Sequence, residues 1–367
     1  MRVVVCGGGV IGTAIAYFLS RRGASPIVVE PIGVASAASG KSGGFLALDW
    51  CDGTPLQALA RRSFALHAAL AEAVGSDWGY RRVTTYGGFG NADGGQAGEG
   101  GLPWLSDRIT IGRRLGNRTT TAQLEPAAFT RGLMRAAEAG GAELRHACVT
   151  GVVHENGTAR GVIVDGETIA ADAAVIAMGP WSMLAAEWLP LPPVFGLKGH
   201  SLVFDTGTKL SADALFVEYR EASGAVQTPE VFPRTDGTTY VCGISGESPL
   251  PIDPADVTPD PGTIERLRRM CEDLSPAFSP AKVVAQQACY RPITRDGLPL
   301  IGRVLGVEGA YIATGHSVWG ILNAPATGEA MAELIADGAA RTIDLSPFNP
   351  GRLPVLDPAR LRWNSMR

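Results

Sequence analysis

The sequence predicts an α/β fold in which a Rossmann-type nucleotide-binding domain is joined to a second, α+β domain built on a mostly antiparallel sheet. The chain opens on a strand, a glycine-rich turn, a helix and a second strand, and strand–helix alternation returns at 118–189 and 290–345. The range 190–289 instead holds strand patterns such as HSLVFD and TTYVCGIS, punctuated by prolines. We therefore assign 1–50, 118–189 and 290–345 to the nucleotide-binding domain, 51–117 and 190–289 to a substrate or cap domain, and 346–367 to a C-terminal tail.

The first thirty residues have the features of a dinucleotide site. The apolar run Val3–Cys6 leads into GGGVIG, which sets glycines in G-x-G-x-x-G spacing directly before a helical pattern. Such glycines allow a tight turn, close approach of a pyrophosphate, and close packing of helix on strand. A second apolar run ends on Glu30, whose carboxylate can accept hydrogen bonds from a ribose and would repel a 2′-phosphate. NADP is therefore disfavoured, and FAD and NAD remain open. The residues expected at the cofactor are Gly7, Gly9, Val10, Ile11, Gly12 and Glu30.

The loop after Glu30 is rich in Gly and Ser and carries Lys41. Its backbone N–H groups and hydroxyls are suited to cover a pyrophosphate, whereas the alternative is a mobile surface loop. A low-complexity excursion is expected at 91–101. The other expected elements are a helix over 55–74 with His67 on its surface or in the core, a strand near 144–149, an Asn-Gly hairpin turn at 156–157, a buried strand over 173–177 and a last helix from Ala326 to Gly338.

Composition excludes several classes of function. The formal net charge of −4, without a basic patch, argues against nucleic acid and anionic membrane as partners. No apolar stretch approaches 18 residues and the first strand begins near residue 2, so we expect no membrane span, no cleavable signal and a cytoplasmic location. Six cysteines without a C-x-x-C or zinc-type spacing favour a reduced compartment and no structural metal. The sequence leaves the oligomeric state open.

Three later segments narrow the function. They are AMGPWS at 177–182, RPITRDGLPLIG at 291–302 and GHSVWGILNAPATG at 315–328. With the N-terminal glycines, they resemble the FAD-dependent amino acid and amine oxidases of the D-amino acid oxidase superfamily, most closely the glycine oxidase-like and sarcosine oxidase-like members. The residues within these motifs are most similar to those of a poorly characterised branch of the superfamily. The resemblance is weaker over 50–120 and 190–280, where the substrate would be chosen. It implies that the cofactor is FAD.

The resemblance also implies which residues hold FAD. The ADP half would lie on the N-terminal glycines and Glu30, and the adenine would meet the backbone of Val149. The isoalloxazine would face the backbone of the segment that begins at Gly315, where oriented N–H dipoles stabilise charge on the reduced ring. Cys289 lies in the register where sarcosine oxidases attach FAD through a thioether, and the alternative is a buried, inert thiol. The further expected cofactor contacts are Ser39, Lys41, Ser42, Gly43, Gly44, Ala177, Gly179, Trp181, Gly315, His316, Gly320, Ile321 and Leu322.

The reaction implied is hydride transfer from a carbon beside an amine or amino acid nitrogen to flavin N5, giving an imine. Arg291 would bind the substrate carboxylate, and the alternative is a structural arginine that pairs with Asp296 or caps a strand end. His316 would contact the flavin or support it from behind, and Trp319 would make the pocket apolar. These three residues, Arg291, Trp319 and His316, are the candidate catalytic residues.

The electron acceptor stays open at this stage. O2 is one acceptor, but Val241 stands where sarcosine oxidase relatives place a lysine that activates oxygen, so a dehydrogenase that passes electrons to a carrier is the alternative. A flavoprotein with a mainly interaction or regulatory role is a third reading.

Overall fold

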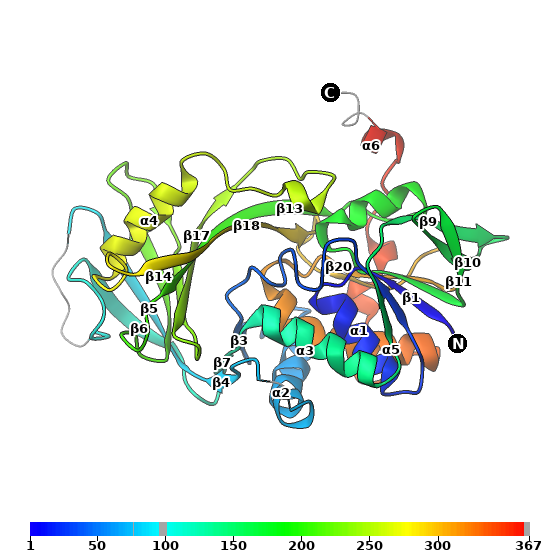
Figure 1. Ribbon diagram of the computed structural model, residues 1–367, viewed down its shortest axis with the longest axis horizontal. Coiled ribbons are helices and arrows are strands. Elements are labelled where there is room, and N and C mark those ends of the chain that lie inside the picture. Colours follow the sequence, from blue (N-terminus) through cyan, green and yellow to red (C-terminus); the bar gives the residue numbers. More distant parts are fainter. Residues whose placement is uncertain (76, 95–100, 363–367) are drawn as a thin grey trace.

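The computed structural model describes residues 1–75, 77–94 and 101–362, which form two halves around two large sheets (Figure 1). The first half, here called the nucleotide half, contains the N-terminal glycine turn and a six-stranded sheet. The second half, here called the substrate half, is an eight-stranded sheet with a helix on its outer face. The expected combination of a Rossmann-type domain with a mostly antiparallel second sheet is confirmed.

The six-stranded sheet is parallel except at one edge, where β19 pairs antiparallel with β20. Both of its faces are covered, which explains why its central strands are continuous apolar runs. Four helices pack on one face and an antiparallel meander packs on the other. The strand order is β19 (Leu300–Arg303), β20 (Ala310–Thr314), β12 (Ala173–Ile176), β1 (Val3–Cys6), β2 (Ile27–Val29), β8 (Glu143–Arg145); the helices are α1 (Val10–Ser20), α2 (Gln57–Ala73), α3 (Pro126–Ala139) and α5 (Gly320–Ala336); the meander is β9 (Val149–Glu155), β10 (Thr158–Val164) and β11 (Glu167–Ala170).

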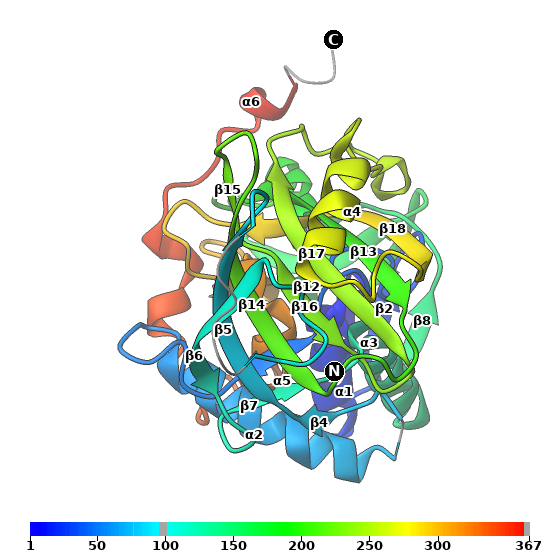
Figure 2. The same ribbon diagram turned by 90° about the vertical axis from the view of Figure 1, so that its left-hand side faces the viewer.

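The eight-stranded sheet is antiparallel at every pairing except that of β14 with β5. Figure 2 looks onto this sheet, with α4 (Thr263–Leu274) lying across it. The face under α4 is a packed apolar core, and the opposite face is turned toward the nucleotide half. The strands in order are β18 (Lys282–Ile293), β13 (Phe195–Asp205), β17 (Thr238–Gly246), β16 (Glu230–Pro233), β14 (Asp213–Arg220), β5 (Thr84–Asn91) and β6 (Ile109–Gly116), with β15 (Val226–Gln227) paired to β14.

Two expectations concern the meander. Asn156 and Gly157 have φ values of 49° and 74° and join β9 to β10, so the Asn-Gly hairpin is confirmed. The single strand near 144–149 is wrong, because β8 ends at Arg145 in the parallel sheet and β9 begins at Val149 in the meander. The chain changes sheets between those two residues.

The last helix begins at Gly320 and ends at Ala336, so the expected start near Ala326 is wrong. Proline is disfavoured inside a helix because it has no N–H to donate to the carbonyl four residues earlier. The structure keeps Pro325 inside α5 because His67, from α2, hydrogen-bonds the carbonyl that the missing amide leaves free.

The domain boundaries drawn from the sequence stay a prediction, and two segments depart from them in packing. Helix α2 falls in the range 51–117, yet its apolar side chains join the core of the nucleotide half. Strand β18 runs unbroken past position 290 within the substrate sheet. The smaller elements are β3 (Phe45–Ala47), β7 (Thr121–Gln123) and β4 (Arg81–Arg82), which form one sheet, the 3₁₀ helices Gly179–Glu187, Pro254–Asp256, Ser317–Trp319, Ser346–Phe348 and Pro350–Arg352, and α6 (Ala359–Arg362).

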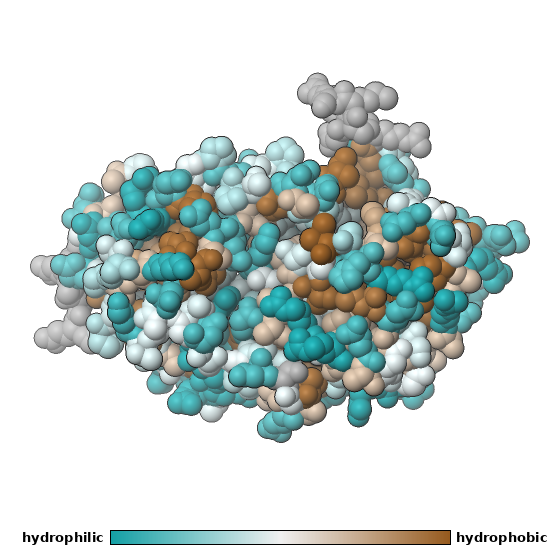
Figure 3. Space-filling view, viewed as in Figure 1, coloured by the Kyte–Doolittle hydropathy of each residue, from teal (hydrophilic) through white to brown (hydrophobic). Residues whose placement is uncertain are grey.

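The first part of the expected C-terminal tail, 346–367, packs against the rest of the protein. Phe348 is buried, and Arg352 forms an ion pair with Asp296 at 2.7 Å. Residues 363–367 of this tail, and 95–100 of the expected excursion, lie outside the described residues. None of the helices that are described has the length and apolar character to cross a bilayer. On the face in Figure 3, polar side chains cover most of both halves and apolar ones gather in separate patches.

Candidate active site

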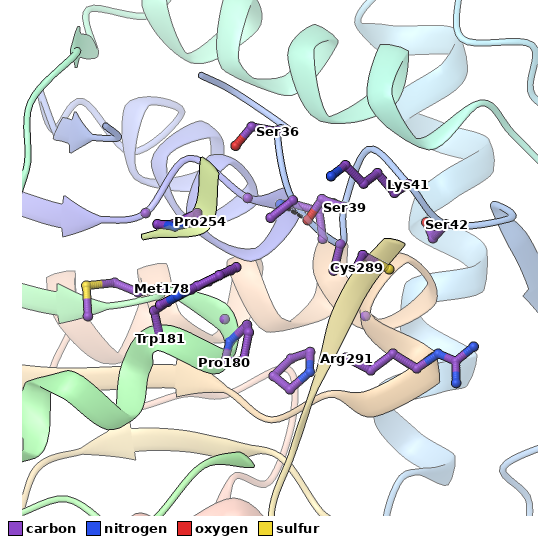
Figure 4. Close-up of a pocket in the computed structure, with 18 of the residues that line it drawn as sticks. Ser36, Ser39, Lys41, Ser42, Met178, Pro180, Trp181, Pro254, Cys289 and Arg291 are labelled. Carbon is purple, nitrogen blue, oxygen red and sulfur yellow. Dashed lines mark hydrogen bonds between the residues drawn. The ribbon is translucent and has the colours of Figure 1, made fainter. Parts of the chain in front are cut away.

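A pocket lies between the two halves and is lined from both (Figure 4). At one end are the β1–α1 turn and Glu30, and at the other are strands of the substrate sheet that carry Cys289 and Arg291. Ser39, Lys41 and Ser42 border it from the loop that precedes β3. The pocket therefore joins the glycine turn to the segment whose sequence was expected to meet the substrate.

The glycine turn is built so that no side chain could replace its first or third glycine. Gly7 has a φ of 115°, and a Cβ there would lie 2.4 Å from the carbonyl oxygen of Ala177. A Cβ on Gly12 would lie 2.0 Å from the carbonyl oxygen of Gly7. Gly9 borders the pocket and precedes the first turn of α1, and the N–H of Val10 donates to the hydroxyl of Ser39 at 2.9 Å. This arrangement leaves a backbone cradle beside a helix N-terminus, where a pyrophosphate binds favourably.

Glu30 is held at the end of β2 by backbone amides. Its carboxylate accepts hydrogen bonds from the N–H groups of Gly8 at 2.8 Å, Ile32 at 3.0 Å and Gly33 at 3.3 Å. These contacts fix a negative charge at the pocket wall, which suits a ribose and opposes a phosphate at that position.

The loop from Ser39 to Gly44 connects the halves. Lys41 Nζ donates to the carbonyl of Ala288 on β18 at 3.2 Å. A Cβ on Gly43 would lie 2.3 Å from the ring of Phe232, and a Cβ on Gly44, whose φ is 77°, would lie 1.9 Å from a backbone oxygen. Among the described residues, the hydroxyl of Ser42 is buried at the pocket without a hydrogen-bond partner. A bound polar group would satisfy it.

The start of α5 forms another wall. Ser317 borders the pocket and has a φ of 51°, a conformation that L-residues rarely adopt and that clusters at functional sites. His316 is buried behind this wall, with Nε2 at 3.1 Å from the hydroxyl of Thr327, and burial lowers its pKa to about 3. His316 is therefore neutral at ordinary pH. Gly320 and Ile321 complete the wall.

The wall from the substrate sheet holds the charged groups. Arg291 lies across Gly199, where a Cβ would come 3.0 Å from the guanidinium, and its Nη1 donates to the hydroxyl of Ser245 at 3.4 Å. Glu230, on β16, accepts a hydrogen bond from the thiol of Cys242 at 3.5 Å. The expected alternative of an Arg291–Asp296 ion pair is wrong, because Asp296 pairs with Arg352.

The comparisons with known proteins agree with this geometry. The sequence profile of the DAO family, described as FAD dependent oxidoreductase, matches residues 2–334. The chain belongs to this family.

Two full-length relatives extend the match. One is a protein of Schizosaccharomyces pombe that is named as an oxidoreductase by provisional assignment. It is 29% identical over 384 residues, covering 95% of this chain and 97% of the relative. Glycine oxidase of Geobacillus kaustophilus is 27% identical over 394 residues, covering 95% of this chain and 96% of the relative. The crystal structure of glycine oxidase from Geobacillus kaustophilus superimposes with a TM-score of 0.79 at 25% identity, over 95% of this chain and 98% of that one.

Membership of the DAO family decides between the two cofactors that the N-terminal motif left open: the cofactor is FAD. The residues present fit it. The glycine cradle, the fixed carboxylate of Glu30 and the unpartnered hydroxyl of Ser42 suit a dinucleotide with ribose and phosphate groups. The binding roles of individual residues stay predictions.

The structure brings most of the expected site residues to one pocket. Those that line it are Gly7, Gly9, Val10, Glu30, Ser39, Lys41, Ser42, Gly43, Val149, Gly179, Trp181, Cys289, Arg291, Gly320 and Ile321. The other expected site residues do not line it: Ile11, Gly12, Gly44, Ala177, Gly315, His316, Trp319 and Leu322. Trp319 packs edge-on against Trp50, with ring centroids 6.4 Å apart.

Apart from Cys289 and Arg291, sequence reasoning missed the pocket residues of the substrate sheet. Tyr240 and Cys242 face the pocket, whereas Val241 between them is buried in the core under α4. Val241 therefore does not occupy the place of a lysine that faces the pocket. Alternation along TTYVCGIS was visible, but not which set of residues faces the pocket. The other lining residues that were missed include Cys148, His200, Glu230, Ile252 and Pro254.

Proposed function

We propose that this DAO-family protein oxidises a small amino acid at the carbon that bears its nitrogen, leaving an imine that water hydrolyses. FAD, when bound, supplies the acceptor for the hydride that leaves that carbon. A relative that is similar to this chain both in sequence and in structure is named glycine oxidase, which supports an amino acid of small size as the starting hypothesis.

Arg291 is the observation that carries this proposal. Its guanidinium lies in the pocket, and among the described residues it forms no ion pair with a carboxylate within 4.0 Å. The fixed fork of a guanidinium binds a carboxylate through two parallel hydrogen bonds. A substrate carboxylate held there would orient the reacting carbon, and a hydride transfer depends mainly on such positioning.

The remaining wall favours an apolar side chain on the substrate. Val318 borders the pocket and is 59% exposed, and the next residue in the chain, Trp319, packs against Trp50. His316 is neutral and bonded to Thr327, so its proposed role is to support the backbone that faces the flavin.

Replacing Arg291 tests the carboxylate role. Arg291→Ala should lose about 2 to 5 kcal/mol of transition-state binding for an amino acid, as in truncation of one side of a desolvated charge pair. Arg291→Lys should recover only part, because it restores the charge without the fork. The measurement is kcat/KM for an amino acid and for its decarboxylated amine, with the flavin spectrum as a check on folding. Equal losses on both substrates would reject the carboxylate role.

The electron acceptor is tested in the same assays. Release of peroxide on addition of an amino acid would identify an oxidase, and turnover with a dye alone would identify a dehydrogenase. A flavin that no amine or amino acid bleaches would favour a role in interaction or regulation and would overturn the proposal.

A further inference from the structure

Glu230 is a carboxylate in the pocket wall to which the proposed reaction has so far given no part. It opens strand β16, where Val231 points into the core under α4 and Phe232 packs toward Gly43. Alternation along the strand therefore turns Glu230 to the face that looks at the nucleotide half. Cys242, its cross-strand neighbour on β17, donates its thiol proton to the carboxylate at 3.5 Å.

Glu230 and Arg291 face the same cavity without closing on each other. They stand on β16 and β18, with β17 and β13 between them. Within the described part of the chain, the two side chains form no ion pair within 4.0 Å, and the guanidinium reaches over Gly199 toward Ser245 instead. A positive and a negative group held apart in one cavity are complementary to a molecule that carries both charges itself.

The surroundings of Glu230 make its carboxylate more basic than an exposed one. Removal from solvent raises the pKa of its carboxyl group, and the charge of Arg291 and the thiol of Cys242 oppose that rise. A carboxylate of raised pKa holds a proton more readily near neutral pH. The titratable and charged groups that border the cavity around it are Cys242 and Tyr240 from β17, Arg291 and Cys289 from β18, His200 from β13 and Lys41 from the loop before β3.

We propose that Glu230 binds the ammonium group of a zwitterionic amino acid whose carboxylate is held by Arg291, and that it takes one proton from that ammonium. This inference rests on the proposed function. One N–H bond of the substrate breaks and leaves its electron pair on nitrogen, one O–H bond forms from a lone pair of Glu230, and nothing is oxidised or reduced in this step. The product is a neutral amine, whose nitrogen lone pair can support loss of hydride from the neighbouring carbon. The substrate class is therefore a free amino acid with an unblocked nitrogen.

The test is the rate of flavin bleaching after anaerobic mixing of the FAD-loaded protein with glycine, N-methylglycine or either enantiomer of alanine or leucine, over a range of pH. Glu230→Gln keeps the shape and removes the base, so the rate should fall about 100-fold near neutral pH. The loss should shrink steadily as the pH approaches the pKa of the amino acid's own ammonium group, because the substrate then arrives without the extra proton.

A matched control is Glu218→Gln, the same change at an exposed position on β14, which should leave the rates unchanged. A second readout is independent of turnover. Propionate, which has the carboxylate but no amine, should perturb the flavin spectrum with a dissociation constant in Glu230→Gln no higher than in wild type, because the substitution removes a negative charge that acts on Arg291. If Glu230→Gln loses FAD, Glu230→Asp takes its place and should retain the wild-type shape of the pH profile at a lower rate.

The outcomes separate the two proposals. If no amino acid of the panel bleaches the wild-type flavin, the proposed function fails first. If wild type is bleached but Glu230→Gln is equally fast, or is slower by the same factor at every pH, the proton-accepting role of Glu230 is wrong and the proposed function stands. Weaker binding of propionate to Glu230→Gln would show that Glu230 only shapes the carboxylate site.

Discussion

At the scale of single residues, the shape of the pocket depends on glycines, which have no side chain, as much as on the residues that line it. Arg291 reaches the cavity because Gly199 leaves the space that its guanidinium crosses. Phe232 fits under the cofactor loop because Gly43 has no Cβ. Substitution of either glycine would therefore move a residue of the site without touching its chemistry.

Cys289 gives a prediction at this scale. Its thiol borders the pocket, and burial raises its pKa, although the charges of Arg291 and Lys41 oppose the rise. Because the thiolate is the nucleophile, a raised pKa disfavours formation of a thioether. We expect acid precipitation of the purified protein to leave yellow FAD in the supernatant. A yellow pellet that turns colourless in Cys289→Ser would show a covalent bond instead.

At the scale of elements, the start of α5 is held in place by α2. Pro325 has no N–H to give to the carbonyl of Ile321, and the N–H of Ala326 donates to the hydroxyl of Ser63 at 3.0 Å. The two carbonyls that this arrangement releases, those of Ile321 and Leu322, both accept from Nε2 of His67, at 3.0 and 3.1 Å. One histidine thus satisfies two buried carbonyls in the turn that borders the pocket.

His67 therefore carries a prediction about stability and pH. His67→Leu leaves both carbonyls unsatisfied and should lower the free energy of unfolding by about 2 to 4 kcal/mol. His67→Gln keeps an N–H donor at similar reach and should lose less. Chemical denaturation of the FAD-loaded proteins measures the difference. A smaller loss in the leucine variant than in the glutamine variant would contradict this account.

The pH dependence follows from the same burial. Burial lowers the pKa of His67 to about 4, from 6.5 in the unfolded chain. As the pH falls below 6.5, His67 is protonated in the unfolded chain but stays neutral in the folded chain down to about pH 4. The free energy of unfolding therefore decreases across that window. The decrease that is due to His67, about 1.4 kcal/mol per pH unit, should be absent in His67→Gln. Parallel stability curves for the two proteins between those pH values would reject the role of burial.

At the scale of the whole molecule, a strap from the substrate half crosses to the nucleotide half. The strap is residues 247–262, and Ile252 and Pro254 in it line the pocket. Trp181 Nε1 donates to the carbonyl of Pro251 at 2.8 Å, and the Tyr290 hydroxyl donates to the carbonyl of Pro249 at 2.6 Å. The far end of the strap is held by Asp260, which accepts from Lys198 Nζ at 2.6 Å and from the hydroxyl of Ser248 at 2.7 Å.

The strap should strengthen the binding of FAD. Trp181→Phe keeps the ring and removes the hydrogen bond to the strap, a change of about 0.5 to 1.5 kcal/mol, so the dissociation constant for FAD should rise about 2- to 10-fold. Quenching of flavin fluorescence on titration of the apoprotein measures it. Trp104→Phe is the matched control, because its indole donates to Ser211 at 3.0 Å away from the pocket. Equal affinities in the two variants would leave the strap without a role in cofactor retention.

The sequence by itself determined the parts of this protein that depend on local backbone constraints. The G-x-G-x-x-G turn, the acidic end of β2 and the Asn-Gly hairpin each require particular residues at fixed spacing, so their positions could be predicted before any contact was known. Tertiary structure alone decided which residues of strands β13, β16 and β17 face the pocket, because a strand pattern of period two does not say which face is buried against what. It also decided that Pro325 stays inside α5, since the donor that permits this, His67, comes from a helix far away in the chain. Glu230 was missed for the same reason: it opens a short strand, and only the strand order and register of the substrate sheet place it on the same face as Arg291.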